Sequence, residues 1–202
     1  MSDLFAEQSQ KADGLKPLAE RLRPKTIDEV IGQGQILDKD APLQAMLASR
    51  KLGSVVFWGP PGVGKTTLAR LLADHTNLHF EQISAIFSGV ADLKKYFESA
   101  KLRAANGRGT LLFVDEIHRF NKAQQDGFLP HMEDGTILLV GATTENPSFE
   151  LNAALLSRAQ VMVLTRLSEV DLDQLLERAE KDLGQKLALR PPARKALVSM
   201  AD

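Results

Sequence analysis

The sequence predicts an α/β domain built on a mainly parallel β-sheet. Short apolar runs rich in β-branched residues alternate with stretches whose apolar residues recur at helical spacing, which is typical of βαβ units. The chain has 202 residues, of which 44% are hydrophobic and 25% are charged. This composition suits one globular domain and part of another, and it excludes a mostly disordered or fibrous chain.

The first three expected elements surround a glycine-rich stretch. Residues 54–58 (SVVFW) form an apolar run that indicates a buried strand. Residues 66–73 carry Leu68, Leu71 and Leu72 at helical spacing, so a helix is expected there. Residues 79–84 form a weaker strand candidate.

The same alternation continues as far as residue 164. A helix is expected over 91–105, because Leu93, Phe97 and Ala100 follow one another in steps of three and four. The turn Asp134-Gly135 ends the helix expected after it. The remaining expected elements are strands at 110–114, 136–142 and 161–164 and helices at 121–132 and 151–156.

The pattern changes after Ser168, where strand-like runs stop. Leu172, Leu176 and Leu183 mark one face of a helix for which Ser168 is a suitable cap. Pro191-Pro192 opens another helix, which has no stop signal before Asp202. We therefore expect residues 168–202 to begin a helical subdomain that is cut short. Residues 1–16 have little apolar content and are expected to be a flexible tail.

Charge and cysteine content exclude several classes of protein. The net charge is −1, which excludes a globally basic nucleic-acid-binding protein but leaves room for a local basic patch. The sequence has no cysteine, so disulfides, thiolate metal sites and a cysteine nucleophile are excluded. It contains no apolar run of membrane-spanning length and no signal-peptide pattern at its start, so a cytoplasmic protein without a membrane contact is expected.

A phosphate-binding loop is expected between the first strand and the first helix. Residues 59–66 (GPPGVGKT) fit the pattern G-x-x-x-x-G-K-[ST], with a strand before it and a helix start after it. Glycines let backbone N–H groups close around an anion, and the helix N-terminus adds its positive end. A lysine then reaches the β- and γ-phosphates and a hydroxyl binds Mg²⁺. The nucleotide-binding set is Gly59, Pro60, Pro61, Gly62, Val63, Gly64, Lys65, Thr66 and the following Thr67.

Two carboxylates follow the strand at 110–114. Asp115 and Glu116 stand at its carboxyl end, where parallel α/β sheets bind ligands. Asp115 is expected to hold Mg²⁺ with Thr66, and Glu116 to activate the attacking water. An ordinary pair capping the next helix is the alternative, but the phosphate loop makes it the weaker one. A water-activating base favours a hydrolase over a small-molecule kinase.

Two further groups of residues have a functional and an ordinary interpretation. The threonines at the start of residues 143–146 (TTEN) can bind the γ-phosphate or the attacking water, although such residues also close strands as simple turns. Arg158 ends a short helix, where it can reach a neighbouring subunit's γ-phosphate or merely pair with the helix dipole. The histidines His75, His79, His118 and His131 lack metal-ligand spacing and are expected to have surface or capping roles.

In this order the motifs resemble those of the AAA+ ATPases. Residues 22–24 (LRP), 31–33 (IGQ), 113–122 (FVDEIHRFNK) and 141–150 (GATTENPSFE) are similar to the replication-associated recombination protein A family, the bacterial counterpart of the Werner-helicase-interacting ATPase. The resemblance covers about residues 17–202, and its long stretches are more specific than the nucleotide-binding motifs alone.

The resemblance implies an architecture and an activity. The fold is a P-loop NTPase with a five-stranded parallel sheet between helices, organised as tail 1–16, nucleotide-binding core 17–167 and the start of a helical lid at 168–202. The implied activity is DNA-dependent hydrolysis of ATP with Mg²⁺, in replication fork maintenance, recombination and DNA repair. DNA ends and single-strand/duplex junctions, single-stranded-DNA-binding protein and a homotetramer are the implied partners, at the nucleoid of a bacterial cytoplasm.

The resemblance also implies roles for single residues. Lys65, Glu116, Thr144 and Arg158 are the implied catalytic residues, with Thr144 favoured over Thr143 as the strand-end sensor and Arg158 as the arginine finger. Arg23, Pro24, Ile31 and Gly32 match the segment that surrounds adenine in the superfamily. A second sensor arginine and the tetramerisation region are expected beyond Asp202, so turnover by this chain alone stays open.

Alternative functions remain within the same superfamily and outside it. The chain can be another AAA+ DNA machine, such as a clamp-loader subunit or a branch-migration motor. It can also be an ATP-gated adaptor that hydrolyses slowly, although an adaptor does not need the water-activating Glu116.

Overall fold

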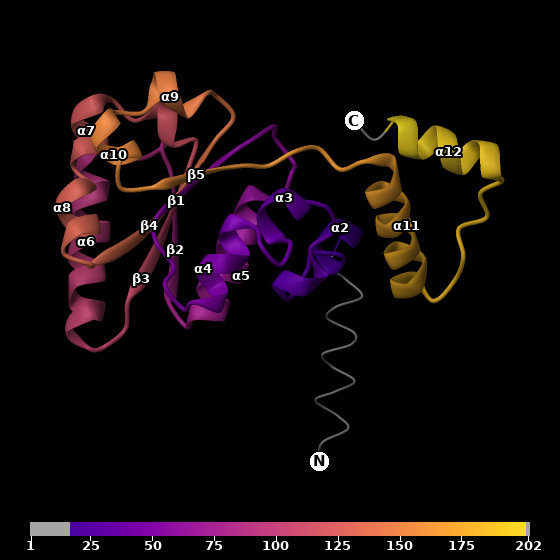
Figure 1. Ribbon diagram of the computed structural model, residues 1–202, viewed down its shortest axis with the longest axis horizontal. Helices are drawn as coiled ribbons and strands as arrows, with labels where there is room; N and C mark the ends of the chain where they lie inside the picture. The colour runs from indigo at the N-terminus through magenta and orange to yellow at the C-terminus, as the bar shows by residue number, and fades with distance from the viewer. Residues whose placement is uncertain (1–16, 201–202) are drawn as a thin grey trace, which may run out of the picture. The chain divides into compact units, whose positions relative to one another are not determined.

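A five-stranded parallel sheet forms the centre of the computed structural model, which describes residues 17–200. The strand order is β2-β3-β4-β1-β5, and every neighbouring pair is parallel. Figure 1 shows helices on both faces of this sheet, which confirms the fold class that the sequence predicts. The strands are β1 (Val55–Trp58), β2 (His79–Ser84), β3 (Thr110–Asp115), β4 (Ile137–Thr143) and β5 (Gln160–Val163).

The described chain divides into two compact units. The sheet unit comprises Gln33–Arg166, and the helical unit combines residues 17–32 with residues 167–200. The second boundary lies within one residue of the expected change at 167/168. Residues 17–32, which the sequence places with the nucleotide-binding core, group by their contacts with the C-terminal helices instead. The flexible tail expected at residues 1–16 lies outside the described residues.

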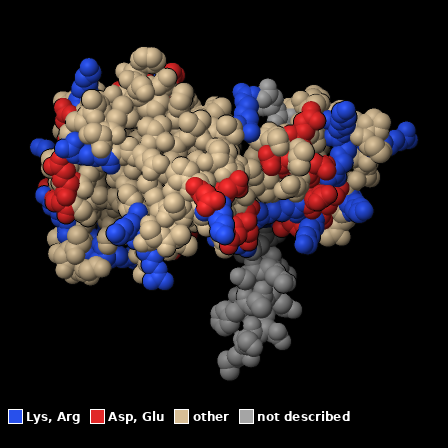
Figure 2. Space-filling view, viewed as in Figure 1, with Lys and Arg blue, Asp and Glu red and all other residues tan. Residues whose placement is uncertain are grey.

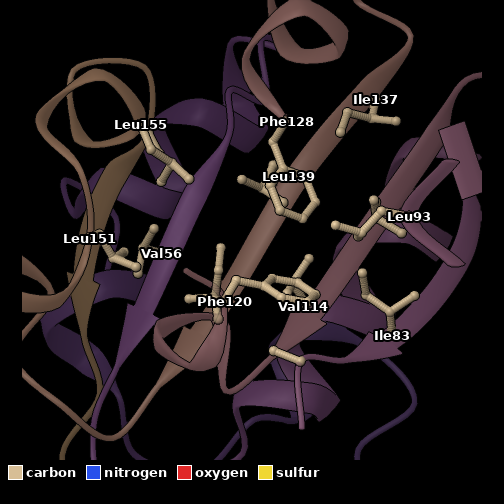
Figure 3. Packing of buried hydrophobic residues seen from close by; sticks show 14 of the residues in the cluster. Val56, Ile83, Leu93, Val114, Phe120, Phe128, Ile137, Leu139, Leu151 and Leu155 are labelled. Atoms are coloured by element: carbon tan, nitrogen blue, oxygen red, sulfur yellow. The ribbon is translucent and has the colours of Figure 1, made fainter. Parts of the chain in front are cut away.

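Both faces of the sheet are covered because its central strands are apolar throughout. Val114 and Leu139 point into one cluster of buried side chains together with Phe128 (Figure 3). Phe113 lies on the other face, where it stacks on Phe80. The helices of this unit are α3 (Gly34–Leu37), α4 (Pro42–Ala48), α5 (Lys65–Thr76), α6 (Val90–Ala105), η2 (Ile117–Arg119), α7 (Lys122–Asp126), α8 (Leu129–Glu133), α9 (Pro147–Glu150) and α10 (Ala153–Leu156).

One expected helix is divided in two. The sequence predicts a single helix over 121–132, but the structure has α7 and α8 with a break at Gly127-Phe128. Pro130 explains the break, because it has no N–H to donate to the carbonyl of Asp126 and its ring clashes with that carbonyl. The prediction of one continuous helix was therefore wrong, although both helices lie within or next to the predicted range.

The helical unit contains α2 (Leu18–Arg21), η1 (Ile27–Glu29), α11 (Glu169–Leu183) and α12 (Pro191–Met200). Ser168 caps α11 as expected, and Asp171 completes a capping box by accepting a hydrogen bond from the Ser168 backbone N–H. Arg178 of α11 pairs with Glu29 at 2.8 Å, which joins the two parts of this unit. In the described residues, no helix has both the length and the apolar character needed to cross a membrane.

His131 of α8 lies among apolar side chains, where a charged ring is unfavourable. Its ring centroid is 4.1 Å from that of Phe97, and its Nδ1 is buried without a hydrogen-bond partner. Burial lowers the pKa of His131, and the positive charge of Lys101 lowers it further, against a smaller opposing effect of Asp134. This histidine is half-buried in the last turn of α8, and its ring packs against Phe97 of the core, so it is more enclosed than a simple surface residue.

Protonation of His131 is expected to destabilise the fold. Below about pH 6.5 the unfolded chain takes up a proton at this ring that the folded chain resists. The free energy of unfolding should therefore have its highest value above that pH. It should decrease as the pH drops toward the lowered pKa of His131. Urea denaturation between about pH 7.5 and about pH 5.5 should show a smaller pH dependence in His131→Gln than in the wild-type chain.

The control for this experiment is His75→Gln. His75 is exposed on α5, so its replacement should leave the pH dependence as it is in the wild-type chain. The same pH dependence in wild type and His131→Gln would contradict the assignment to His131.

Candidate active site

The loop between β1 and α5 has a backbone that only glycine adopts easily. Gly62 and Gly64 have φ angles of +81° and +97°, in the left-handed region that strains other residues. Glycine is needed at position 59 for a different reason, because a Cβ there would stand 2.3 Å from the carbonyl oxygen of Leu164. The sequence pattern of the loop thus corresponds to a backbone shape that side chains at these three positions would disrupt.

Helix α5 directs its N-terminus at this loop. Gly64 is its N-cap, and no side chain caps the helix. The first N–H groups of a helix lack partners within the helix and carry its partial positive charge. An uncapped N-terminus behind a glycine-rich loop therefore fits the phosphate groups of a nucleotide. Thr66 and Thr67 follow in the first turn of α5.

Lys65 lies folded along the loop. Its Nζ donates to the carbonyls of Gly59 and Pro60, each at 2.7 Å, and the residue is only 8% exposed. Burial lowers the pKa of Lys65, while the negative charges of Glu116 and Asp115 act in the opposite direction. Both carboxylates thus act electrostatically on the lysine. They stand at the end of β3, which is separated from β1 by β4 in the sheet.

Three strands end at the same edge of the sheet, and this brings the polar residues together. Trp58, the last residue of β1, is in register with Thr143, the last residue of β4. Asp115 ends the neighbouring strand β3, and its carbonyl accepts a hydrogen bond from the N–H of Ala85 at 2.9 Å. Parallel α/β sheets bind ligands at this carboxyl edge.

Glu116 follows β3 in a strained conformation. Its φ and ψ are +52° and +46°, the left-handed region that costs a non-glycine residue about 1–2 kcal/mol. Its side chain is 26% exposed, and the Thr144 hydroxyl donates toward its Oε2 at 3.5 Å. The residue pair that the sequence suggested as base and sensor is thus in contact, with the carboxylate still open to water.

His118 was missed as a site residue, because the sequence suggested only a surface or capping role for it. Its side chain is 6% exposed, and its Nδ1 lies 3.2 Å from Oε2 of Glu116 and 2.9 Å from Oγ1 of Thr143. The short helix η2 turns the chain back on itself after Glu116 and places the ring beside it. Nothing in the apolar spacing indicated this turn, so the contact had no signal in the sequence.

Arg158 lies just after α10. Its Nε donates to Oε1 of Glu133 at 2.7 Å, and its Nη1 donates to the carbonyl of Ala154 at 2.9 Å. The second contact is the helix-end pairing that is the ordinary interpretation of this arginine. The side chain is nevertheless 39% exposed, so the guanidinium is also open to an approaching molecule. Its role as an arginine finger stays a prediction.

The residues expected around adenine belong to the helical unit, whereas the phosphate loop belongs to the sheet unit. Arg23 pairs with Glu20 at 2.7 Å, and Pro24 and Ile31 lie in the connection on either side of η1. Gly32 has a φ of +71°, and a Cβ there would meet Cδ2 of Leu167 at 2.7 Å. Adenine binding by these four residues stays a prediction.

The donor atoms at the sheet edge fit magnesium with a nucleotide. Mg²⁺ prefers oxygen ligands and is usually held by one or two protein groups together with phosphates and waters. The Asp115 carboxylate at the end of β3 and the Thr66 hydroxyl in the first turn of α5 are oxygen donors of this kind.

Comparison with known proteins gives a family and several relatives. Residues 55–167 match the family described as "ATPase family associated with various cellular activities (AAA)". The chain is 47% identical to replication-associated recombination protein A of Escherichia coli K12, over 100% of this chain and 46% of that protein. It is 42% identical to the ATPase WRNIP1 of Dictyostelium discoideum, over 95% of this chain and 22% of that protein.

A solved structure agrees with these relatives. The RuvB Holliday junction branch migration motor of Thermotoga maritima superimposes with a TM-score of 0.70 and 31% identity, covering 88% of this chain and 59% of that one. The chain spans less than half the length of the two curated relatives above.

Proposed function

Because the chain belongs to the AAA family of ATPases, in the branch of replication-associated recombination protein A and WRNIP1, we propose that it binds Mg·ATP at the loop before α5 and hydrolyses it to ADP and phosphate. One observation carries this proposal. The buried Lys65, the carboxylates of Asp115 and Glu116 and the hydroxyl of Thr144 gather at one edge of the sheet, beside an uncapped helix N-terminus.

The binding residues act on the phosphates. Lys65 exchanges the carbonyls of Gly59 and Pro60 for oxygens of the β- and γ-phosphates, which is favourable because those oxygens carry charge. Asp115 and Thr66 hold the magnesium ion, which when bound neutralises charge on the phosphate oxygens. The loop from Gly59 to Thr66, with Thr67 behind it, surrounds the phosphates with backbone N–H groups.

The hydrolytic residues act on water. Glu116 accepts a proton from the water that attacks the γ-phosphate, and the exposed part of its side chain, 26%, leaves the carboxylate open to that water. Thr144 orients the same water or the γ-phosphate through its hydroxyl, since it lies within reach of the Glu116 carboxylate. A hydrolase needs a base that activates water, as we propose for Glu116. The presence of this carboxylate disfavours an adaptor that binds ATP without hydrolysing it.

The relatives support a role on DNA. Their names refer to replication-associated recombination and to branch migration at Holliday junctions. We propose that this chain's hydrolysis depends on DNA ends or single-strand/duplex junctions, in fork maintenance, recombination and repair, where it meets single-stranded-DNA-binding protein. This role places it at the nucleoid in the cytoplasm. On the face drawn in Figure 2, Lys and Arg lie among Asp and Glu over α11 and α12, so that face does not single out a DNA-binding surface.

A branch-migration motor is the second candidate, because the solved RuvB structure is 31% identical with a TM-score of 0.70. The relatives named for recombination share more residues with the chain and match it over a larger share of its length. We therefore favour the fork-associated ATPase over the motor.

Turnover with and without DNA tests the proposed role. The rate of phosphate release per chain should rise when DNA with a single-strand/duplex junction is added, and it should rise with protein concentration if neighbouring subunits share the site. Fully paired DNA without ends (a closed circle) is the matched control. Equal rates with junction DNA, closed circular DNA and no DNA would contradict the DNA-dependent role.

Arg158 tests whether a neighbour completes the site. Arg158→Ala should lower turnover steeply, since arginine fingers contribute roughly 10³–10⁵ in rate, while ATP affinity stays unchanged. Mixing Arg158→Ala with Glu116→Gln should restore part of the activity, because an intact Glu116 faces an intact arginine wherever the two variants are neighbours in the right order. Arg108→Ala, in the exposed turn before β3, is the control. A mixture without regained activity, although the chains associate in the ultracentrifuge, would contradict the shared site.

A further inference from the structure

We propose that His118 is a positioning residue, which holds the carboxylate of Glu116 and joins it to the end of β4 through Thr143. The inference rests on the proposed hydrolysis of ATP, because it deepens the account of the same site. It is carried by one geometric fact. The Nδ1 atom of a nearly buried ring lies within 3.2 Å of the carboxylate and within 2.9 Å of the threonine hydroxyl.

The two contacts of Nδ1 lead us to place a hydrogen on this nitrogen of the ring. A carboxylate has no hydrogen to donate, so a contact between Oε2 of Glu116 and Nδ1 is favourable only when Nδ1 is the donor. Oγ1 of Thr143 then accepts from the same N–H, and it also accepts from the backbone N–H of Glu145 at 3.0 Å. The Thr143 hydroxyl hydrogen points to the carbonyl of Glu145 at 3.3 Å. The ring is therefore assigned as the Nδ1–H tautomer.

The Glu116 carboxylate has buried residues on one side and solvent on the other. Thr143 is fully buried at the end of β4, and the His118 side chain is 6% exposed, so water does not readily replace either partner. Glu116 keeps 26% of its side chain exposed. His118 thus fixes the carboxylate from the protein side and leaves its other side to the attacking water.

The same contacts connect two parts of the site. Thr144, next to Thr143 in the chain, is the residue that we place at the γ-phosphate or its attacking water. If nucleotide binding shifts the end of β4, Thr143 moves with it, and the contacts of the His118 ring connect that movement to Glu116. Since a displacement of about 1 Å at a catalytic group can cost about 100-fold in rate, a positioning contact of this kind matters for turnover.

Substitutions at both ends of the contact test the proposal by kinetics. His118→Phe removes the donor, and Thr143→Val removes the hydroxyl at nearly constant volume. Each should lower kcat by about tenfold or more while the KM for ATP stays within about twofold, and the double variant should be no slower than the worse single one. His118→Asn, whose amide nitrogen can take the place of Nδ1, should recover most of the rate, whereas His118→Gln, with its amide one atom farther out, should not.

Each of these kinetic results has an outcome that overturns the proposal. A kcat of His118→Phe within about twofold of wild type would do so, and so would strictly additive effects in the double variant. No better turnover by His118→Asn than by His118→Phe, with both chains folded by circular dichroism, would also overturn it. His75→Phe and His75→Asn, on the exposed part of α5, are the matched controls.

A second measurement judges the contact without using turnover. Two-bond ¹H–¹⁵N spectra of the histidine rings should show the Nδ1–H tautomer for His118, and Glu116→Ala should change its ring signals but not those of His131. An Nε2–H tautomer in the wild-type chain, or signals that ignore Glu116→Ala, would overturn the positioning role. If the wild-type chain released no phosphate, the proposed function would fail, and these spectra would still decide whether His118 holds Glu116.

Discussion

Lys65→Ala should weaken the binding of Mg·ATP by about 30-fold or more, because removing one partner of a desolvated charge pair costs at least about 2 kcal/mol. Lys65 is 8% exposed and already close to the loop carbonyls, so little reorganisation separates it from the phosphates. Without the lysine, the backbone N–H groups are the only groups of the loop that interact with the phosphate charge. Isothermal titration calorimetry with ATP and magnesium measures the change directly.

The control for Lys65→Ala is Lys51→Ala. Lys51 is exposed just before β1, so its removal changes the net charge equally without touching the loop. Its affinity for Mg·ATP should match that of the wild-type chain. Unchanged affinity in Lys65→Ala, with the helical content intact, would mean that the loop before α5 does not hold the phosphates.

Glu116→Gln should bind ATP with nearly wild-type affinity and hydrolyse it at least about 100-fold more slowly, since general bases contribute about 10²–10⁴ in rate. The amide keeps the size of the side chain and an oxygen that can accept from His118, but it cannot take a proton from water. Bound nucleotide should therefore remain ATP. Quenched-flow analysis of the nucleotide recovered from the protein distinguishes ATP from ADP.

The matched control for Glu116→Gln is Glu145→Gln. Glu145 lies at the same edge of the sheet with an exposed side chain, and its contacts with Thr143 come from its backbone. Its replacement should leave turnover unchanged. If Glu116→Gln turned over ATP at the wild-type rate, another group would have to activate the water.

The sheet and the phosphate loop could be predicted because they depend on local signals. Apolar β-branched runs identified the strands to within a residue at most ends, and β2 was predicted with the bounds that the structure has. The loop pattern specifies Gly59 and Gly64, and the loop holds Gly62 as well; the backbone angles or close contacts at all three exclude other residues. The carboxylates of Asp115 and Glu116 could be placed near it, because strand ends share an edge in a parallel sheet.

Other features depend on contacts between distant residues and had no local signal. The turn η2 brings His118 beside Glu116. Glu133 binds Arg158, which is 25 positions later in the sequence. The grouping of residues 17–32 with the C-terminal helices comes from pairs such as Glu29 with Arg178. The break between α7 and α8 is different, since Pro130 stands in the sequence and indicates a helix boundary locally.

A single-turnover experiment shows whether this edge of the sheet hydrolyses ATP. A concentrated excess of the chain is mixed with labelled Mg·ATP and junction DNA, and both bound nucleotide and released phosphate are followed. We expect the wild-type chain to bind ATP and release phosphate, Lys65→Ala to bind ATP at least about 30-fold more weakly and to release correspondingly little phosphate, and Glu116→Gln to bind ATP and keep it intact. Binding without phosphate release by the wild-type chain, or equal release by all three, would contradict hydrolysis at this edge of the sheet.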